Sequence, residues 1–127
     1  MSCQWYLLAW ERAFDISGRS RRKEYWTFSL INTLILILLE VVCIASDKNG
    51  EINVISRAVI LAFLLVSLIP TWTGLVRRLH DTNKSAWWLL YYLVPLIGPV
   101  VIFVVTLFDS DPALNRYGED PKCAPAN

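Results

Sequence analysis

The sequence contains little of what most catalytic and metal-binding sites require. It has a single histidine and three cysteines, Cys3, Cys43 and Cys123, and no two of these cysteines form a C-x-x-C pair. One imidazole excludes zinc sites that need two or more, and the cysteine spacing indicates neither a disulfide framework nor a thiolate metal site. No Ser/His/Asp triad and no phosphate-binding glycine loop can be assembled. We therefore predict no enzyme activity, no metal and no cofactor.

Charge is scarce as well. Only 18% of the residues are charged and 55% are hydrophobic, with a formal net charge of +1 that gives no case for nucleic acid binding. The mean hydropathy of +0.43 lies above that of typical soluble proteins. The charged residues gather in the first 25 positions, two short loops and the tail, which leaves three apolar stretches. Lipid is therefore the expected surrounding.

The three apolar stretches predict membrane spans over residues 26–45, 54–76 and 86–108. At about 1.5 Å per residue, each is long enough to cross a hydrocarbon core of roughly 30 Å. The first begins too late and lacks the cleavage pattern of a secretory signal, so we interpret it as an uncleaved anchor. We predict an all-α integral membrane protein, a single membrane domain over residues 1–127. It comprises three transmembrane helices, a short N-terminal interfacial helix within the cytoplasmic or interfacial segment 1–25, and a polar tail over 109–127.

The leading segment is too apolar for a free tail and too short to span. Residues 1–14 contain Trp5, Tyr6, Trp10 and Phe14, which favours a short helix that lies on the membrane with its aromatic side down. The alternative is that this helix packs on the other helices without touching lipid. The basic run over residues 19–24 stands directly before the first span and acts as an orientation signal.

The path of the third apolar stretch decides on which side of the membrane the tail lies. Pro95, Gly98 and Pro99 interrupt the middle of residues 86–108, which predicts either one kinked span or two half-helices that form a re-entrant hairpin. A three-span topology places eight Lys and Arg on the side of the N-terminus and four on the other, whereas a hairpin makes the ratio ten to two. Both favour a cytoplasmic N-terminus. Charge favours the hairpin and segment length favours the kinked span, which we prefer, leaving the side of the tail open.

Two charged residues fall within the predicted spans. Glu40 lies near the end of the first and Arg57 about one turn inside the second, on the same side of the membrane. We predict an intramembrane ion pair between them, since an unpaired charge in this layer is costly. The alternative is that Arg57 extends alone to the membrane surface.

Residues 77–85 form the polar stretch between the second and third spans, and we expect a loop there. Arg77 and Arg78 emerge where the second span meets water, and together with Arg22 they are candidates for binding lipid phosphate, which guanidinium groups hold with two hydrogen bonds. The alternative is that they only set the topology.

His80 and Asp81 resemble a base with an orienting carboxylate, but a structural hydrogen bond is the favoured interpretation because the chain has no second histidine. In the tail, Arg116 is predicted to dock against Asp81 or Glu24, which requires the tail on the cytoplasmic side. The structural polar motif that we predict consists of His80, Asp81, Asn115, Arg116 and Tyr117.

The motifs together resemble a known family. They are the basic run before Tyr25-Trp26, the RRLHD sequence over residues 77–81 with Trp87-Trp88, the PLIG sequence over 95–98, and the NRYG sequence over 115–118. This combination is similar to the bacterial inner-membrane family catalogued as domain of unknown function 805. The chain departs from the family over residues 109–114, where the family usually has a glycine-rich approach to the NRYG motif. The resemblance implies a small multi-span bacterial inner-membrane protein and supplies no activity, cofactor or catalytic residue.

The expected function is that of a non-enzymatic inner-membrane protein with a cytoplasmic N-terminus. Its basic and aromatic cytoplasmic face is predicted to bind anionic lipid or a protein partner, so the expected partners are membrane lipids and a second copy or another membrane protein. The alternative is an oligomeric small transporter or channel component, motivated by Glu40, Arg57 and the Pro-Gly breaks. An enzyme that acts on lipid head groups through His80 and Asp81 ranks last.

Overall fold

The structure, a computed structural model, describes residues 2–47, 53–112 and 114–121. The elements follow one another as α1 (Ser2–Glu11), α2 (Arg22–Ser46), α3 (Val54–Asp81), the 3-10 helix η1 (Ala86–Leu93) and α4 (Ile97–Leu107). The described ranges contain no β-strand, only an isolated bridge between Asn115 and Gly118. The predicted all-helical fold class is confirmed.

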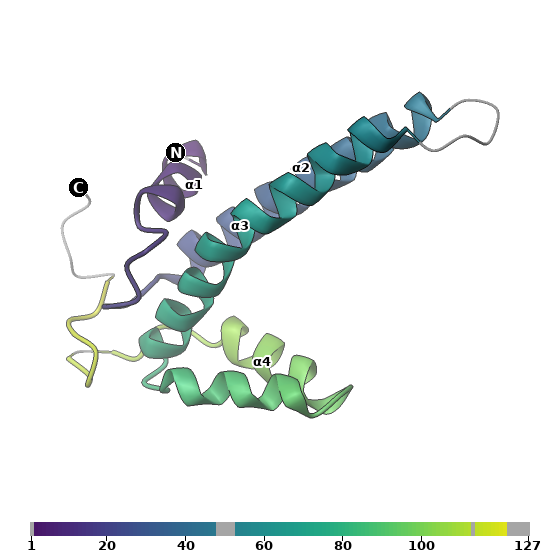
Figure 1. Ribbon diagram of the computed structural model, residues 1–127. Helices are drawn as coiled ribbons and strands as arrows, with labels where there is room; N and C mark the ends of the chain where they lie inside the picture. The colour runs from purple at the N-terminus through teal and green to yellow at the C-terminus, as the bar shows by residue number, and fades with distance from the viewer. Residues whose placement is uncertain (1, 48–52, 113, 122–127) are drawn as a thin grey trace.

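Helices α2 and α3 form a long antiparallel pair that extends away from the rest of the chain (Figure 1). Each is long and apolar enough to cross a membrane. Their outer faces expose large apolar side chains along the whole pair, for example Leu34 at 64%, Leu38 at 63% and Leu65 at 57%. A continuous apolar surface of this size is unfavourable in water and matches a lipid surrounding.

Helix α3 begins and ends with recognisable caps. The Asn53 side chain accepts hydrogen bonds from the backbone N–H groups of Ile55 and Ser56, at 3.1 and 3.3 Å. At the other end Asn83 takes a positive φ of 58°, while Lys84 N–H donates to the Leu79 carbonyl at 2.9 Å. This is the C-terminal arrangement in which a left-handed residue ends a helix.

The position of this cap corrects one prediction. Residues 77–81 are not a loop, because α3 continues through Pro70 and ends at Asp81. The helix extends past the apolar stretch because its last turns are buried by other parts of the chain, and only residues 82–85 connect α3 to η1.

The third apolar stretch also differs from the preferred prediction. Residues 86–108 do not form one kinked helix. Instead η1 and α4 lie side by side and antiparallel, joined by a turn over residues 94–96 (Figure 1). In this turn Leu96 has a φ of 69°, a conformation that L-residues rarely adopt. The segment therefore forms a hairpin, which is the alternative that the charge distribution favoured.

Gly98 permits this hairpin. A Cβ atom at this position would lie 1.5 Å from the Tyr91 carbonyl oxygen and 2.4 Å from its carbon. Only glycine allows the first turn of α4 to approach the backbone of η1 so closely. A span made of one continuous helix would have no such contact, since residues 91 and 98 would be stacked along the same axis.

Helix α1 packs on the beginning of α2. The ring of Tyr6 stacks on Phe28 with centroids 5.5 Å apart, and Trp10 meets Phe28 edge-on at 6.4 Å. The turn that follows α1 contains Gly18 at a φ of 83°, a left-handed conformation that glycine adopts without steric cost. Tyr6 and Trp10 of the leading helix thus face another helix, while Phe14 is 85% exposed, so both interpretations of residues 1–14 stay predictions.

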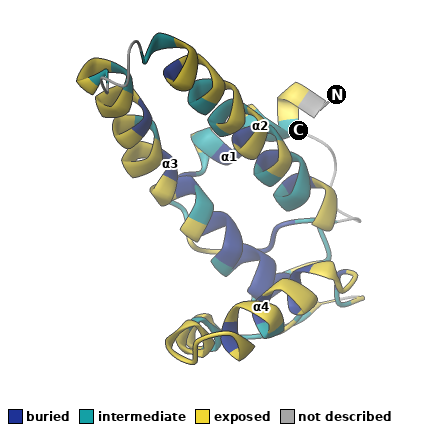
Figure 2. Ribbon diagram, turned by 90° about the vertical axis from the view of Figure 1, so that its right-hand side faces the viewer, coloured by how far each residue is buried: buried dark blue, intermediate teal, exposed yellow. Residues whose placement is uncertain are grey.

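The core lies at the end of the molecule where these parts meet. Figure 2 shows buried residues concentrated along the second half of α3, where it approaches α4, while the far end of the α2–α3 pair is mostly exposed. The buried part of α3 includes Leu75, Leu79 and the charged residues of the RRLHD motif. The fold therefore positions its most polar helix turns, not its most apolar ones, in the interior.

Candidate functional site

Five charged side chains are buried together at this end of the molecule. Their side-chain exposures are 6% or less. Two belong to the segment that enters α2 and to its first turn, and three to the last turns of α3. We call them the buried ion cluster: Arg19, Glu24, Arg77, Arg78 and Asp81.

Asp81 is the centre of the cluster. Its Oδ1 atom lies 3.0 Å from the Nε atom of Arg19, while its Oδ2 atom accepts hydrogen bonds from Arg78 Nη1 and from the Ser110 hydroxyl. Two guanidinium groups and a hydroxyl therefore share one carboxylate. Burial of these charges is tolerated because each is paired and hydrogen-bonded.

Arg78 connects this centre to the end of α4. Its Nε atom donates to the Thr106 carbonyl at 3.1 Å, and its Nη2 atom donates to the Phe108 carbonyl. The Trp26 indole N–H also donates to the Thr106 carbonyl, at 3.2 Å. Carbonyls in the last turn of a helix lack intrahelical donors and carry partial negative charge, so these donors stabilise the end of α4 and fix its place.

Arg77 joins α3 to α2. Its Nη1 atom lies 3.2 Å from Glu24 Oε1, and its carbonyl accepts a hydrogen bond from Ser20 N–H at 3.2 Å. The buried Nε atom of Arg77 has no hydrogen-bond partner in the described part of the chain. The pair is the only link of this kind that we find between the first turn of α2 and α3 within the described ranges.

Arg19 holds the tail. Its Nη2 atom donates to the carbonyls of Asp81, at 3.1 Å, and Asp111, and its Nη1 atom donates to the Gly118 carbonyl at 3.3 Å. The Asp111 N–H in turn donates to the Asp81 carbonyl at 2.9 Å. Arg19, which precedes the first long helix, thus contacts the tail at two carbonyls.

The predicted polar motif comes together around His80. The Tyr117 ring stacks on the imidazole with centroids 3.9 Å apart and an interplanar angle of 3°, and the Asn115 amide donates to the His80 carbonyl at 3.0 Å. The Nδ1 atom of His80 lies 3.3 Å from the Gly18 carbonyl oxygen. Arg116 is exposed, with its guanidinium carbon 5.7 Å from the Tyr117 ring centroid and its Nε atom 3.5 Å from Asn83 Oδ1.

The part of the sequence that contains these motifs matches a known protein family. The family model described as "Protein of unknown function (DUF805)" matches residues 13–119. The chain belongs to this family. It is 41% identical over 124 residues to Inner membrane protein YhaH of Escherichia coli (strain K12), an alignment that covers 95% of this chain and 98% of the relative. It is 38% identical over 119 residues to Inner membrane protein YhaI of the same organism, covering 94% and 96%. No solved structure matches the chain.

The geometry of this DUF805 protein changes the expected roles of the arginines. Arg77 and Arg78, predicted to meet lipid phosphate, are 1% and 0% exposed, so their guanidinium groups face protein partners instead. Arg22 is exposed and donates to the Leu107 carbonyl at 3.3 Å. Their predicted position at the water boundary is wrong, because Glu24 pairs with Arg77 and the end of α4 accepts hydrogen bonds from Arg78, contacts that the sequence alone does not show.

Other predicted contacts of this DUF805 protein are rearranged as well. Arg116 does not pair with Asp81 or Glu24, because Arg19 and Arg78 occupy the first and Arg77 the second. Asp81 does not orient His80, since its carboxylate is bound by the cluster. Within the described residues, no three His, Cys, Asp or Glu side chains form a group that could hold a metal ion.

Sequence reasoning missed Arg19 and Glu24 as cluster members. Both lie in the basic run over residues 19–24, Arg19 before α2 and Glu24 in its first turn, and we interpreted that run only as an orientation signal. A signal was present: one acid stands inside that run, and Asp81 stands three residues after Arg78, a spacing at which helical side chains meet. The basic run over residues 19–24 and the RRLHD sequence of this DUF805 protein each contain arginine and a carboxylate. This combination could have indicated that ion pairs join the two motifs.

At the far end of the α2–α3 pair the structure brings Glu40 and Arg57 together. Arg57 Nη1 lies 3.3 Å from Glu40 Oε2, and its Nη2 atom lies 3.1 Å from Asp47 Oδ2. Asp47 also accepts a hydrogen bond from the Asn53 N–H at 2.8 Å. This bond, together with Arg57, holds the pKa of Asp47 below its ordinary value. The sequence did not indicate Asp47 as a third member of this group.

Proposed function

We propose that the protein is a non-enzymatic, multi-pass protein of the bacterial inner membrane whose N-terminus and tail both lie in the cytoplasm. The named relatives are inner membrane proteins, and α2 and α3 are long and apolar enough to cross a bilayer. The observation that carries the topology is the Arg19 contact set, which joins the leading segment, the end of α3 and the tail. Segments joined in this way lie on one side of the membrane.

The absence of an enzymatic role is supported by the state of Asp81. A general base or nucleophile needs a side chain that can reach a substrate. Asp81 is 0% exposed and bound to two arginines and a serine, so it is a structural residue. His80, with Tyr117 stacked on its ring, has no carboxylate partner among the contacts of the described residues.

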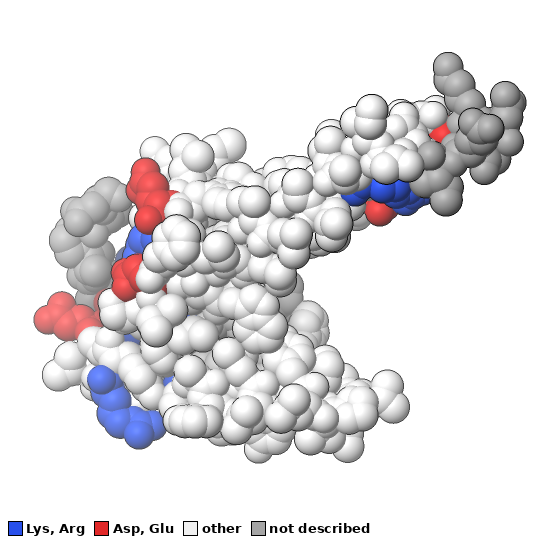
Figure 3. All heavy atoms as spheres, viewed as in Figure 1, with Lys and Arg blue, Asp and Glu red and all other residues white. Residues whose placement is uncertain are grey.

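The proposed ligand of the cytoplasmic end is anionic lipid. Three basic residues lie outside the buried ion cluster: Arg22 binds the Leu107 carbonyl at the end of α4, the Lys84 ammonium lies 5.7 Å from the Phe108 ring centroid, and Arg116 contacts Asn83 just after α3. We call Arg22, Lys84 and Arg116 the basic patch. Figure 3 shows a basic surface at the lower left, at the end of the molecule opposite the tip of the α2–α3 pair, with acidic side chains above it at the same end.

Aromatic residues accompany the basic patch. The Lys84 ammonium also lies 5.4 Å from the centroid of Trp88, and the neighbouring Trp87 is 76% exposed. Tryptophan is enriched at the level of lipid head groups, and cationic side chains at that depth attract anionic lipid by about 1 kcal/mol each. A surface patch that combines tryptophan with cationic side chains is therefore suited to binding anionic lipid head groups.

Native mass spectrometry of the full chain in mild detergent tests this proposal. We expect the wild type to retain added phosphatidylglycerol and the Lys84→Gln/Arg116→Gln variant to retain several-fold less. Arg57→Gln, at the opposite end of the α2–α3 pair, is the matched control and should behave as the wild type. Equal retention by all three proteins would refute lipid binding at the patch, and a co-purifying protein lost from the double variant would assign the patch to a protein partner instead.

A second candidate function is that of an oligomeric transporter or channel component. It is favoured by the broken third apolar segment, because helices interrupted within the membrane often line substrate pathways. Two long helices and a hairpin are too few for a pathway, so this function requires several copies. A mass in mild detergent equal to one chain, together with no solute flux in liposomes, would eliminate it.

A further inference from the structure

The molecule is wider at the end that holds the buried ion cluster than at the far end of the α2–α3 pair. We call residues 22–34 of α2 and 68–81 of α3 the near half of the pair, and the remainder of both helices the far half. Figure 1 shows α1 and the η1–α4 hairpin beside the near half on different sides. In the described part of the chain no other element lies beside the far half, where Leu38 and Leu61 are 63% and 57% exposed.

The η1–α4 hairpin is too short to cross a membrane. The eight residues of η1 extend about 16 Å at roughly 2.0 Å per residue, and the eleven residues of α4 extend about as far at roughly 1.5 Å per residue. Each arm therefore covers about half of a hydrocarbon core of roughly 30 Å. Both arms are attached at the polar end, since η1 closely follows α3 and the Thr106 carbonyl of α4 accepts a hydrogen bond from Arg78.

Two ring contacts show the direction in which the hairpin points. Trp26 in α2 meets Phe103 in α4 edge-on, with centroids 5.6 Å apart. Farther along, Trp72 in α3 meets Tyr92 in η1 with centroids 5.7 Å apart. Tyr92 lies next to the hairpin turn, and Trp72 lies nine residues, about 14 Å, before the end of α3. The hairpin thus extends alongside the near half, toward the membrane interior, and its tip reaches the depth of Trp72.

The surface of the hairpin is apolar throughout. Residues 86–108 contain no charged side chain, and none of the residues of η1 is buried. At the tip, Leu93 and Leu96 are 79% and 86% exposed. Lipid hydrocarbon matches such a surface, as it matches the outer faces of α2 and α3.

Helix α1 widens the near half on another side. Tyr6 stacks on Phe28, which belongs to the near half of α2. The Thr73 hydroxyl, in the near half of α3, donates to the Ala13 carbonyl at 2.6 Å. Leu7, on α1, is 59% exposed. The leading helix therefore adds apolar cross-section at the same depth as the hairpin.

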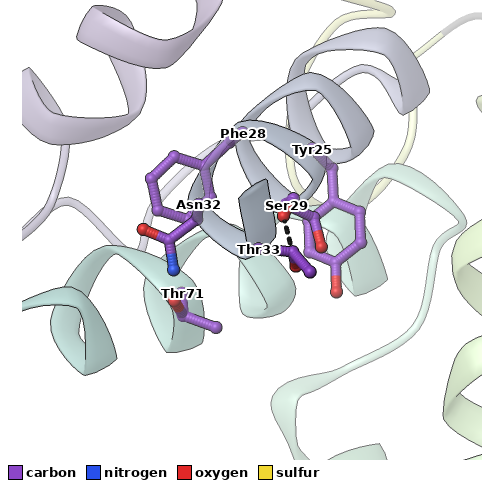
Figure 4. Close-up of a pocket in the computed structure, with 6 residues that line it drawn as sticks. All are labelled: Tyr25, Phe28, Ser29, Asn32, Thr33 and Thr71. Atoms are coloured by element: carbon purple, nitrogen blue, oxygen red, sulfur yellow. Dashed lines mark hydrogen bonds between the residues drawn. The ribbon is translucent and has the colours of Figure 1, made fainter. Parts of the chain in front are cut away.

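The α2–α3 pair is itself hollowed at this depth. A pocket of about 120 Å³ lies between the two helices (Figure 4) and is lined by Tyr25, Phe28, Ser29, Asn32, Thr33 and Thr71. All six residues belong to the near half, so the pocket also adds to the cross-section of the molecule there.

We propose that the protein is a membrane wedge that favours bilayers whose cytoplasmic leaflet is convex. The inference rests on the proposed topology, in which the near half lies in the cytoplasmic leaflet. That leaflet then holds α1, the hairpin and the near half, whereas of the described elements the opposite leaflet holds the far half alone. Head groups are spread apart in a convex leaflet, so inserting the larger cross-section there costs less. The partner is thus a curved lipid surface.

Sorting between a giant vesicle and a narrow membrane tube pulled from it tests the proposal, because the outer leaflet of the tube is convex. Two proteins with one cysteine each are reconstituted in phosphatidylcholine with phosphatidylglycerol, the other cysteines being replaced by serine. One keeps Cys3 at the polar end, and the other carries Val54→Cys at the far end. A membrane-impermeant dye added outside labels the chains whose cysteine faces outward.

We expect chains labelled at Cys3 to be enriched several-fold in the tube, and increasingly so as the tube narrows. Chains labelled at position 54 have the opposite orientation and should be depleted from the tube. Equal densities in tube and vesicle for both labels would refute the wedge. Enrichment of both would refute it as well, because a wedge reverses its preference with its orientation. This comparison uses the wild-type hairpin and does not depend on how a hairpin variant folds.

Leu93→Asp in the Cys3 protein tests the part of the hairpin. A carboxylate at the exposed tip is costly in hydrocarbon, so the hairpin should leave the leaflet and the enrichment should fall. Val54→Asp adds the same charge at the far end and should keep the enrichment of the wild type. If Leu93→Asp sorts as Val54→Asp does, the hairpin does not form the wedge.

A failure of the proposed topology is detected separately. A protein that carries both Cys3 and Glu119→Cys gains two dyes per labelled chain when the leading segment and the tail share one side, and one dye when they do not, as read by intact mass spectrometry. Two dyes without sorting refute the wedge and leave the topology standing. One dye refutes the topology and the wedge with it.

Discussion

At the residue scale, Asp81 is the side chain on which most other contacts depend. The Asp81→Asn substitution keeps its shape but removes the negative charge, which leaves Arg19 and Arg78 buried beside each other without a counter-charge. We predict a loss of about 3–5 kcal/mol in the free energy of unfolding, as for other buried pairs that lose one partner. Thermal unfolding in detergent measures this.

Glu119→Gln is the control for that substitution, since Glu119 is an exposed carboxylate at the same end of the chain. We expect it to change stability by less than about 0.5 kcal/mol. If Asp81→Asn unfolds at the same temperature as Glu119→Gln, the cluster does not stabilise the fold.

The residue types of the cluster were predictable but their environment was not. The sequence indicates that Arg77, Arg78 and Asp81 follow an apolar helix, and a solvent-exposed position is the ordinary one for three charges within five residues. Their burial depends on the tail and on Arg19, which are separated from them by many residues. Glu40 and Arg57, in contrast, are linked by a short connection, and the same sequence reasoning places them within reach of each other.

At the scale of elements, Gly98 distinguishes the hairpin from a continuous span. A Cβ atom there meets the Tyr91 carbonyl oxygen at 1.5 Å, so we predict that Gly98→Ala forces η1 and α4 apart and lowers the unfolding temperature markedly. In a continuous helix the same substitution would stabilise the protein by about 1 kcal/mol. The sign of the change in thermal stability therefore decides between the two structures.

Gly74→Ala is the matched control. Gly74 lies inside α3, and the nearest atom to an added Cβ is Tyr25 Cδ2 at 3.9 Å, an ordinary contact. We expect this variant to be as stable as the wild type or slightly more so. A Gly98→Ala variant that unfolds at or above the temperature of Gly74→Ala would contradict the hairpin.

The elements themselves could largely be predicted from hydropathy. Two apolar stretches became α2 and α3, with the first helix starting at Arg22 and the second ending at Asp81, both beyond the predicted bounds. A hydropathy profile does not predict the buried ion cluster, whose contacts extend both helices beyond the apolar stretches. It also does not distinguish a span from a hairpin in an apolar stretch with two prolines and a glycine, because the decisive contact is between the backbones of Gly98 and Tyr91.

At the scale of the whole molecule, the buried ion cluster requires that the leading segment and the tail share one side of the membrane. The two arms seen in Figure 1, the α2–α3 pair and the η1–α4 hairpin, both start from this end. Counted by position in the sequence, the proposed topology puts ten Lys and Arg on the cytoplasmic side and two on the other, which agrees with the positive-inside rule. Charge counting favours this proposed topology, whereas segment length favoured a third span, and the side on which each terminus lies stays a prediction.

The measurement that tests this topology most directly is the labelling of single cysteines in intact cells with a membrane-impermeant maleimide. With the other cysteines replaced by serine, three proteins are compared: one that keeps Cys3, one with Glu119→Cys and one with Val54→Cys, which is exposed at the far end of the α2–α3 pair. We predict that Cys3 and position 119 react only after the membrane is permeabilised, whereas position 54 reacts in intact cells. Labelling of position 119 but not Cys3 in intact cells would show that the chain crosses the membrane three times and would contradict the shared polar end.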